Sequence, residues 1–246
     1  MKEILKKCKK EDFKYLSIVL DSYLSFTNDR KRQRLLNNIN CSASRKALIE
    51  LLDRQIRYYG SSDLAYFKRF MLLEKEGVPA SVLIEDVCKK LKIRIRKGGS
   101  VQARLERVVN AIVEKELLSR TPKELSKAFD EIGVGQVDKD LIMEGIKTNG
   151  KFAMLPILTQ IIGIEETISI SEAIIVAMIA QIIGKEAAKG LIKEILKKNP
   201  WLQSLGPVVW SLSIAWIAFD LQRPAFRKTV PVVLYLGIVA MRKDVE

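Results

Sequence analysis

Residues 100–120 read SVQARLERVVNAIVEKELLSR, and this stretch indicates the fold class most clearly. Its apolar residues recur every three or four positions, which is the spacing of one face of an α-helix. They are Val101, Leu105, Val108, Val109 and Ile112. Ser100 follows Gly98-Gly99, and its hydroxyl can accept a hydrogen bond from the first turn. The stretch therefore predicts an amphipathic helix that Ser100 caps.

The sequence on either side of this helix also favours helices. Thr121-Pro122-Lys123-Glu124 has the spacing of a capping box with proline in the first turn, so a further helix should start there. Residues 90–96 are different, because apolar and basic residues alternate as they do in a strand. Since no second strand is visible to pair with them, we interpret them as a helix end that runs into an extended linker, with a strand as the alternative. The expected fold class is all-α.

The charge of the chain is unevenly distributed. The 246 residues include 42 basic and 29 acidic side chains, and residues 1–150 hold 31 and 21 of these. The remaining residues are sparse in charge and rich in apolar side chains. We therefore expect a basic, amphipathic helical domain over residues 1–149 and an apolar helical hairpin region over residues 150–246.

Several kinds of chemistry are disfavoured by composition. Histidine is absent, which removes the commonest general base and the commonest metal ligand. Cys8, Cys41 and Cys88 are far apart and form no C-x-x-C pair, so neither a redox dithiol nor a disulfide framework is indicated. We expect no catalytic residues, no cofactor, no metal and no enzymatic activity. Free thiols and the lack of a signal-peptide apolar core predict a cytoplasmic protein.

Three apolar segments dominate the second half of the sequence. Residues 173–184 are apolar on every face, and the capping-box spacing of Ser169 and Glu172 predicts where that helix starts. Residues 199–219 and 229–241 contain no charged side chain. Three alternatives stay open: a buried core, peripheral contact with the inner face of the membrane, or a spanning helix.

Residues 199–241 are expected to form a hairpin with a charged turn around Pro224. Its second helix should start or bend at Pro231. Apolar surface that the hairpin does not bury would be available for a partner helix or a bilayer. Basic side chains would surround that surface, namely Arg223, Arg227, Lys193, Lys197 and Lys198. The residues expected to bind a partner are Trp210, Trp216, Phe219, Arg223, Phe226 and Arg227.

Basic residues gather in three clusters, at Lys6–Lys10, Lys31–Arg34 and Lys89–Lys97. Such clusters are usually solvated faces, but they can also meet the phosphates of nucleic acid or of an anionic membrane. No aromatic side chain that could stack on bases is interleaved with them. We therefore expect weak nucleic-acid binding or none.

Three segments carry a family resemblance: residues 57–63 (RYYGSSD), residues 87–92 (VCKKLK) and residues 224–231 (PAFRKTVP). From about residue 45 onward the chain resembles the uncharacterised bacterial YaaW-like family, which is grouped with the ubiquinol-cytochrome c chaperone domain. This resemblance implies a helical fold and no enzymatic activity. Its chaperone side implies help in assembling a membrane protein.

Taken together, the residues and the resemblance predict a non-enzymatic, chaperone-like or adaptor protein that binds a protein partner near the membrane surface. The alternative is a nucleic-acid or anionic-lipid binder that uses the basic N-terminal half. The two differ in salt dependence, because phosphate binding weakens steeply with ionic strength and apolar docking does not.

Overall fold

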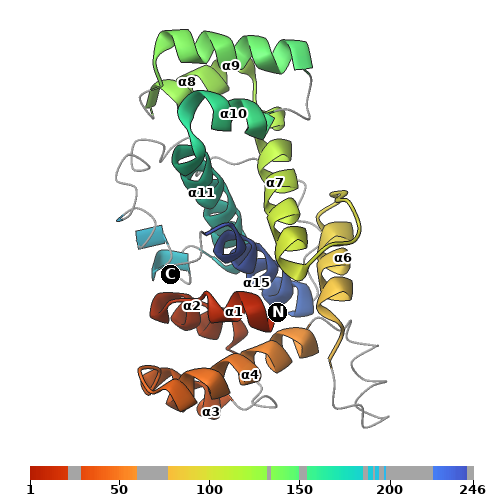
Figure 1. Cartoon of the computed structure of the whole chain (residues 1–246), viewed down its shortest axis with the longest axis vertical. Coiled ribbons are helices and arrows are strands. Elements are labelled where there is room, and N and C mark those ends of the chain that lie inside the picture. The colour runs from red at the N-terminus through yellow and green to blue at the C-terminus, as the bar shows by residue number, and fades with distance from the viewer. Residues whose placement is uncertain are drawn as a thin grey trace. The chain divides into compact units, whose positions relative to one another are not determined.

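A computed structural model describes residues 1–21, 29–59, 77–131, 134–149, 154–184, 188–190, 192–193, 197 and 224–242. Within these residues the regular structure is helical and contains no strand, so the predicted all-α class is confirmed (Figure 1). The helices are α1 (Lys2–Lys6), α2 (Lys10–Leu20), α3 (Asp29–Asn37), α4 (Ser42–Tyr59), α6 (Ala80–Lys90), α7 (Val101–Ser119), α8 (Pro122–Glu131), α9 (Gln136–Asn149), α10 (Met154–Ile162), α11 (Ile164–Ile183) and α15 (Pro224–Met241).

The caps predicted around α7 and α8 are present. The Ser100 hydroxyl accepts a hydrogen bond from the Ala103 N–H at 3.1 Å. Thr121 and Glu124 bond reciprocally: the Thr121 N–H donates to Oε2 of Glu124 at 2.8 Å, and the Glu124 N–H donates to the Thr121 hydroxyl at 3.3 Å. Each cap satisfies N–H groups that the first turn of a helix leaves without an intrahelical partner.

The alternating segment is an extended continuation of α6, which confirms that interpretation over a strand. A Schellman motif ends the helix: the N–H of Lys92 donates to the Lys89 carbonyl and the N–H of Ile93 to the Cys88 carbonyl. Lys92 has a φ of 50°, the left-handed conformation that this motif requires. Leu91 and Ile93 are buried, whereas Lys92, Arg94 and Arg96 are exposed. The alternating apolar and basic residues therefore place apolar side chains in the core and basic side chains in solvent, although the described residues contain no strand that pairs with the segment.

The described helices form two compact units. Unit 1 combines the helices within Met1–Glu106 with α15, and unit 2 lies within Arg107–Trp216. The first residues of α7 belong to unit 1 and its later turns to unit 2. The expected division into 1–149 and 150–246 follows composition rather than contacts and stays a prediction.

Unit 1 is built around α15. This helix contacts α1, α2, α4 and α6, and every residue from Thr229 to Ala240 is buried. The helix α15 begins at Pro224 and contains Pro231 in its interior, so a helix start at Pro231 is wrong. A bend at Pro231 stays a prediction, and so does the charged turn, because residues 220–223 lie outside the described residues. Proline is favourable in a first turn, where the missing N–H has no partner to lose. Tertiary burial then outweighs the hydrogen bond that the interior proline removes.

A carboxylate on α2 joins the two ends of unit 1. Asp12 is buried and accepts a hydrogen bond from the Tyr235 hydroxyl. The Arg242 guanidinium pairs with the same carboxylate at 2.8 Å. The rings of Tyr15 and Tyr235 also pack with centroids 4.2 Å apart. These contacts fix the position of α15 along α2.

Unit 2 contains α8, α9, α10 and α11. The short helix α10 contacts both α9 and α11, and α8 contacts α9. Among the described residues, α11 is the one helix long and apolar enough to cross a membrane, and 72% of its most apolar window is buried. Burial of this kind is also found in the core helices of soluble proteins.

The helix start predicted at Ser169 is wrong. The helix α11 begins at Ile164, directly after Gly163, whose φ of 93° lies in a region that favours glycine. Within the helix, the Thr167 and Ser171 hydroxyls donate to carbonyls four residues earlier, at 2.7 and 2.8 Å. Hydroxyl side chains can be satisfied in this way inside a helix, so capping-box spacing alone does not mark a start.

A fully buried arginine joins α2, α3 and α4. Arg32 has no exposed surface, and its Nε donates to the Ser17 hydroxyl at 2.8 Å. Its Nη1 donates to Asp29 at 2.7 Å and to Gln55 at 2.9 Å, while its Nη2 pairs with Asp21. A buried charge is tolerated when it is paired and fully hydrogen-bonded, as it is here.

We expect Arg32→Met to lower the free energy of unfolding by about 3–5 kcal/mol, because the change leaves buried acceptors without their charged donor. Arg30→Met is the matched control, since Arg30 is exposed on the same helix and the change should stay within about 0.5 kcal/mol. Chemical denaturation of the two purified variants measures both values. Equal losses would contradict the role given to the Arg32 network.

Lys92→Gly is expected to raise the free energy of unfolding by about 0.5–1 kcal/mol, because glycine adopts the left-handed conformation without a clash at Cβ. Lys97→Gly, at an exposed site in the same segment where φ is not positive, should give no gain. Thermal unfolding of both variants tests the difference. A loss of stability in Lys92→Gly would show that the lysine side chain stabilises the segment more than its backbone conformation costs.

Candidate functional site

Two of the residues expected to bind a partner lie within the described part of the chain. Phe226 and Arg227 are in the first turns of α15, whereas Trp210, Trp216, Phe219 and Arg223 lie outside the described residues. Phe226 is half-buried, and the Lys90 ammonium stands over its ring at 5.0 Å from the centroid. Arg227 is exposed. The sequence therefore placed Arg227 on the surface correctly, but the face of Phe226 is covered by a lysine of α6.

Next to this contact, the extended segment after α6 carries a row of exposed cations. We call Lys92, Arg94, Arg96 and Lys97 the basic strip; all four are exposed. Residues 87–97 contain no acidic side chain. The sequence had already indicated a basic cluster here. The structure adds that the apolar residues Leu91 and Ile93 are buried in unit 1 and hold the basic strip in place.

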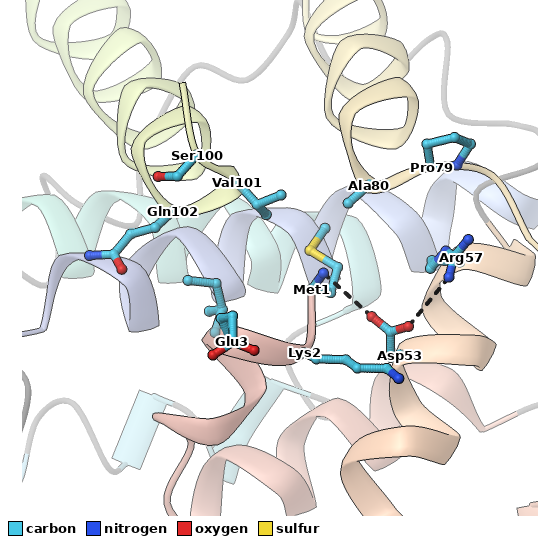
Figure 2. Close-up of a pocket in the computed structure, with 11 residues that line it drawn as sticks. Met1, Lys2, Glu3, Asp53, Arg57, Pro79, Ala80, Ser100, Val101 and Gln102 are labelled. Carbon is cyan, nitrogen blue, oxygen red and sulfur yellow. Dashed lines mark ion pairs between the residues drawn. The ribbon is translucent and has the colours of Figure 1, made fainter. Parts of the chain in front are cut away.

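A pocket of about 620 Å³ opens at the other end of α6 (Figure 2). The first turns of α6 and α7 line one side, at Pro79, Ala80, Ser100, Val101 and Gln102. Met1–Ile4 and two residues of α4, Asp53 and Arg57, line the other. Nothing in the sequence pattern signalled this pocket, because its walls come from four segments that are far apart along the chain.

Three charged groups of the pocket are paired with one another: the Met1 amino group, Asp53 and Arg57. Asp53 is buried and lies between the Met1 amino group at 3.4 Å and Nη1 of Arg57 at 3.6 Å (Figure 2). Arg57 is held in place because its Nε donates to the Val78 carbonyl at 3.0 Å. Ser100, the one hydroxyl in the lining, caps α7. Among the described lining residues, these charged groups are thus engaged in ion pairs and hydrogen bonds that join α1, α4 and the segment before α6.

No group of three or more acidic or cysteine side chains within the described residues is placed to hold a metal ion. Two acidic residues of unit 1 instead pair with arginines of other elements: Asp12 with Arg242, and Glu85 with Arg104 at 2.9 Å. Each of these carboxylates therefore helps to hold two segments of unit 1 together.

In unit 2, the helix α9 presents two large apolar side chains to solvent. Val137 is 73% exposed and Leu141 is 50% exposed, and a spacing of four residues puts them on one face. We call this pair the α9 ridge. The exposed carboxylates of Asp140 and Glu144 run beside it. Ile142 and Lys139, which lie away from the ridge, are buried, and Gly145, one turn after Leu141, lies close to Ile157 of α10.

The three cysteines have free thiols in different environments. Cys8 and Cys88 are buried, and burial raises the pKa of each thiol, that of Cys88 to about 11. Cys41 is exposed directly before α4. Hydrogen bonds from the backbone at Ser44 and Ala43 lower the pKa of its thiol below the usual value.

These features define an all-α protein. Two curated bacterial proteins are distantly similar to it. A UPF0174 protein of Helicobacter pylori strain J99 is 24% identical over 195 residues, which cover 78% of this chain and 71% of the relative. A UPF0174 protein of Helicobacter pylori strain 26695 is 23% identical over 189 residues, covering 76% of this chain and 85% of the relative.

The chain is thus distantly homologous to UPF0174 proteins over most of its length. No family model matches it, and no solved structure matches it.

Under native conditions at pH 8, we expect iodoacetamide to alkylate Cys41 well before Cys8 or Cys88. The thiolate is the reacting form, so the lowered pKa of Cys41 should bring its half-maximal rate below pH 9.0, the ordinary value for the thiol. Peptide mass spectrometry over a pH series measures the rate at each site. The Cys41→Ser variant is the control and should show only slow labelling until the protein is unfolded; fast labelling of native Cys41→Ser would contradict the assignment.

Proposed function

We propose that the protein is a non-enzymatic, chaperone-like adaptor that binds a protein partner through the α9 ridge. The supporting observation is the exposure of Val137 and Leu141 on one face of a helix whose other face is packed. Large apolar side chains that cluster on a surface are typical of docking sites, whereas isolated ones are common everywhere. The role fits a protein that lies in the cytoplasm near the inner face of the membrane.

The charges around the α9 ridge favour one kind of partner. The chain has a formal net charge of +13, yet the exposed row beside the ridge is acidic, with Asp140 and Glu144. Lys139, the lysine nearest in sequence, is buried and paired with Asp130. An amphipathic helix with apolar residues on one face and lysine or arginine beside them would match both features.

The family resemblance supports the same role. The YaaW-like family is grouped with the ubiquinol-cytochrome c chaperone domain, so a partner that is itself a membrane protein is consistent with it. The residues expected to bind a partner within 199–223 would form a second contact region under this proposal. Nucleic-acid binding should be weak or absent.

A photo-crosslinking amino acid at position 141 of the full-length protein in cells tests this function. The captured protein is then identified and purified. Its affinity is measured for the unchanged protein and for the double variant Val137→Ser/Leu141→Ser. We expect this double variant to weaken binding at least tenfold, because each buried aliphatic side chain contributes roughly 1.5–3 kcal/mol.

Ile18→Ser/Val82→Ser is the matched control, since both residues are exposed aliphatic side chains, 51% and 39%, in unit 1. It should bind as the unchanged protein does. Equal affinity of both double variants for the captured partner would exclude the α9 ridge as the docking site.

A further inference from the structure

The basic strip concentrates positive charge on one side of an extended segment. Lys92 has a left-handed conformation, so the two sides of the segment are assigned by burial and not by strand periodicity. Leu91 and Ile93, 1% and 8% exposed, occupy the core side, which leaves Lys92, Arg94 and Arg96 on the solvent side. Figure 1 shows this segment leaving the end of α6 and returning to the start of α7. Its position is therefore fixed at both ends by helices of unit 1.

The surroundings of the basic strip extend its positive charge. Arg227 is exposed beside Phe226, which Lys90 contacts, whereas Lys89, in the last turn of α6, pairs with Asp86 at 3.8 Å. Like charges at this density repel one another, and an anionic surface offsets that repulsion. The Schellman motif and the buried anchors hold the segment in place, so little chain entropy is lost when the surface is bound.

The chemistry of the strip favours a bilayer over nucleic acid. Residues 77–100 contain no aromatic side chain, and the nearby Phe226 ring is covered by Lys90. Single-stranded nucleic acids are bound largely by stacking of bases on exposed aromatic rings, whereas a cluster of lysine and arginine side chains suffices for anionic headgroups. We propose that the basic strip docks unit 1 on a bilayer that contains anionic phospholipid.

Sedimentation of the full-length protein with phosphatidylcholine vesicles that contain roughly 30% phosphatidylserine tests this docking. The protein should bind these vesicles, bind pure phosphatidylcholine vesicles far less, and dissociate as salt rises. Lys92→Gln/Arg94→Gln/Arg96→Gln should weaken binding about 100-fold, which corresponds to about 3 kcal/mol at 1.4 kcal/mol per factor of ten.

Arg30→Gln/Lys31→Gln/Arg34→Gln removes the same charge from exposed positions on α3 and is the matched control. It should change binding less than about threefold if the strip, rather than net charge, makes the contact. Circular dichroism and thermal unfolding check that each variant is folded. If the strip triple variant is unfolded, Arg94→Gln/Lys97→Gln replaces it, with an expected loss of roughly 30-fold.

Three results would overturn the proposal. Equal losses in the strip and control variants would show a general charge effect, and equal binding to neutral vesicles would show that the contact is not electrostatic. Salt-resistant binding to a duplex DNA or single-stranded RNA probe, lost in the strip variant and without vesicle binding, would assign the strip to nucleic acid instead.

Discussion

The burial of α15 among the N-terminal helices is the constraint on which unit 1 depends. Its residues from Thr229 to Ala240 are all enclosed, and α1, α2, α4 and α6 contact it. Hydrophobic burial supplies the driving force, but it does not fix how far along its axis a helix slides. The Asp12 carboxylate does so, because the Tyr235 hydroxyl and the Arg242 guanidinium must both reach it. The basic strip and the pocket are positioned as consequences of this packing.

The sequence was sufficient for the fold class and for features determined by neighbouring residues. Ser100 and the Thr121–Glu124 pair act within one turn, so their spacing predicted the caps. Ser169 and Glu172 have the same spacing but lie inside α11, because Gly163 ends the preceding segment and tertiary burial continues the helix. Pro231 shows the same limit, because local preference favours proline at a helix start, whereas burial places it inside α15.

Features that join distant segments could not be predicted in this way. The pocket brings Met1, Asp53, Ala80 and Val101 together, and no periodicity relates those positions. Arg32 was part of an apparently solvated basic cluster, yet its neighbours Arg30 and Lys31 are exposed while it is enclosed by Ser17, Asp29 and Gln55. A run of basic residues in a sequence shows only that the charges are close along the chain. Whether one of those residues is buried depends on the hydrogen-bond partners that the fold places around it. Of the expected partner-binding residues, Arg227 could be placed on the surface from sequence.

The arrangement of unit 1 also has a consequence for synthesis on the ribosome. The first 106 residues belong with a helix that begins at Pro224, and unit 2 is encoded between them. At roughly 5–20 residues per second, translation of the intervening stretch takes on the order of ten seconds. During that interval the apolar faces of α2, α4 and α6 have no α15 to cover them. A nascent chain of this design must keep α2, α4 and α6 shielded, by one another or by a holding factor, until α15 emerges.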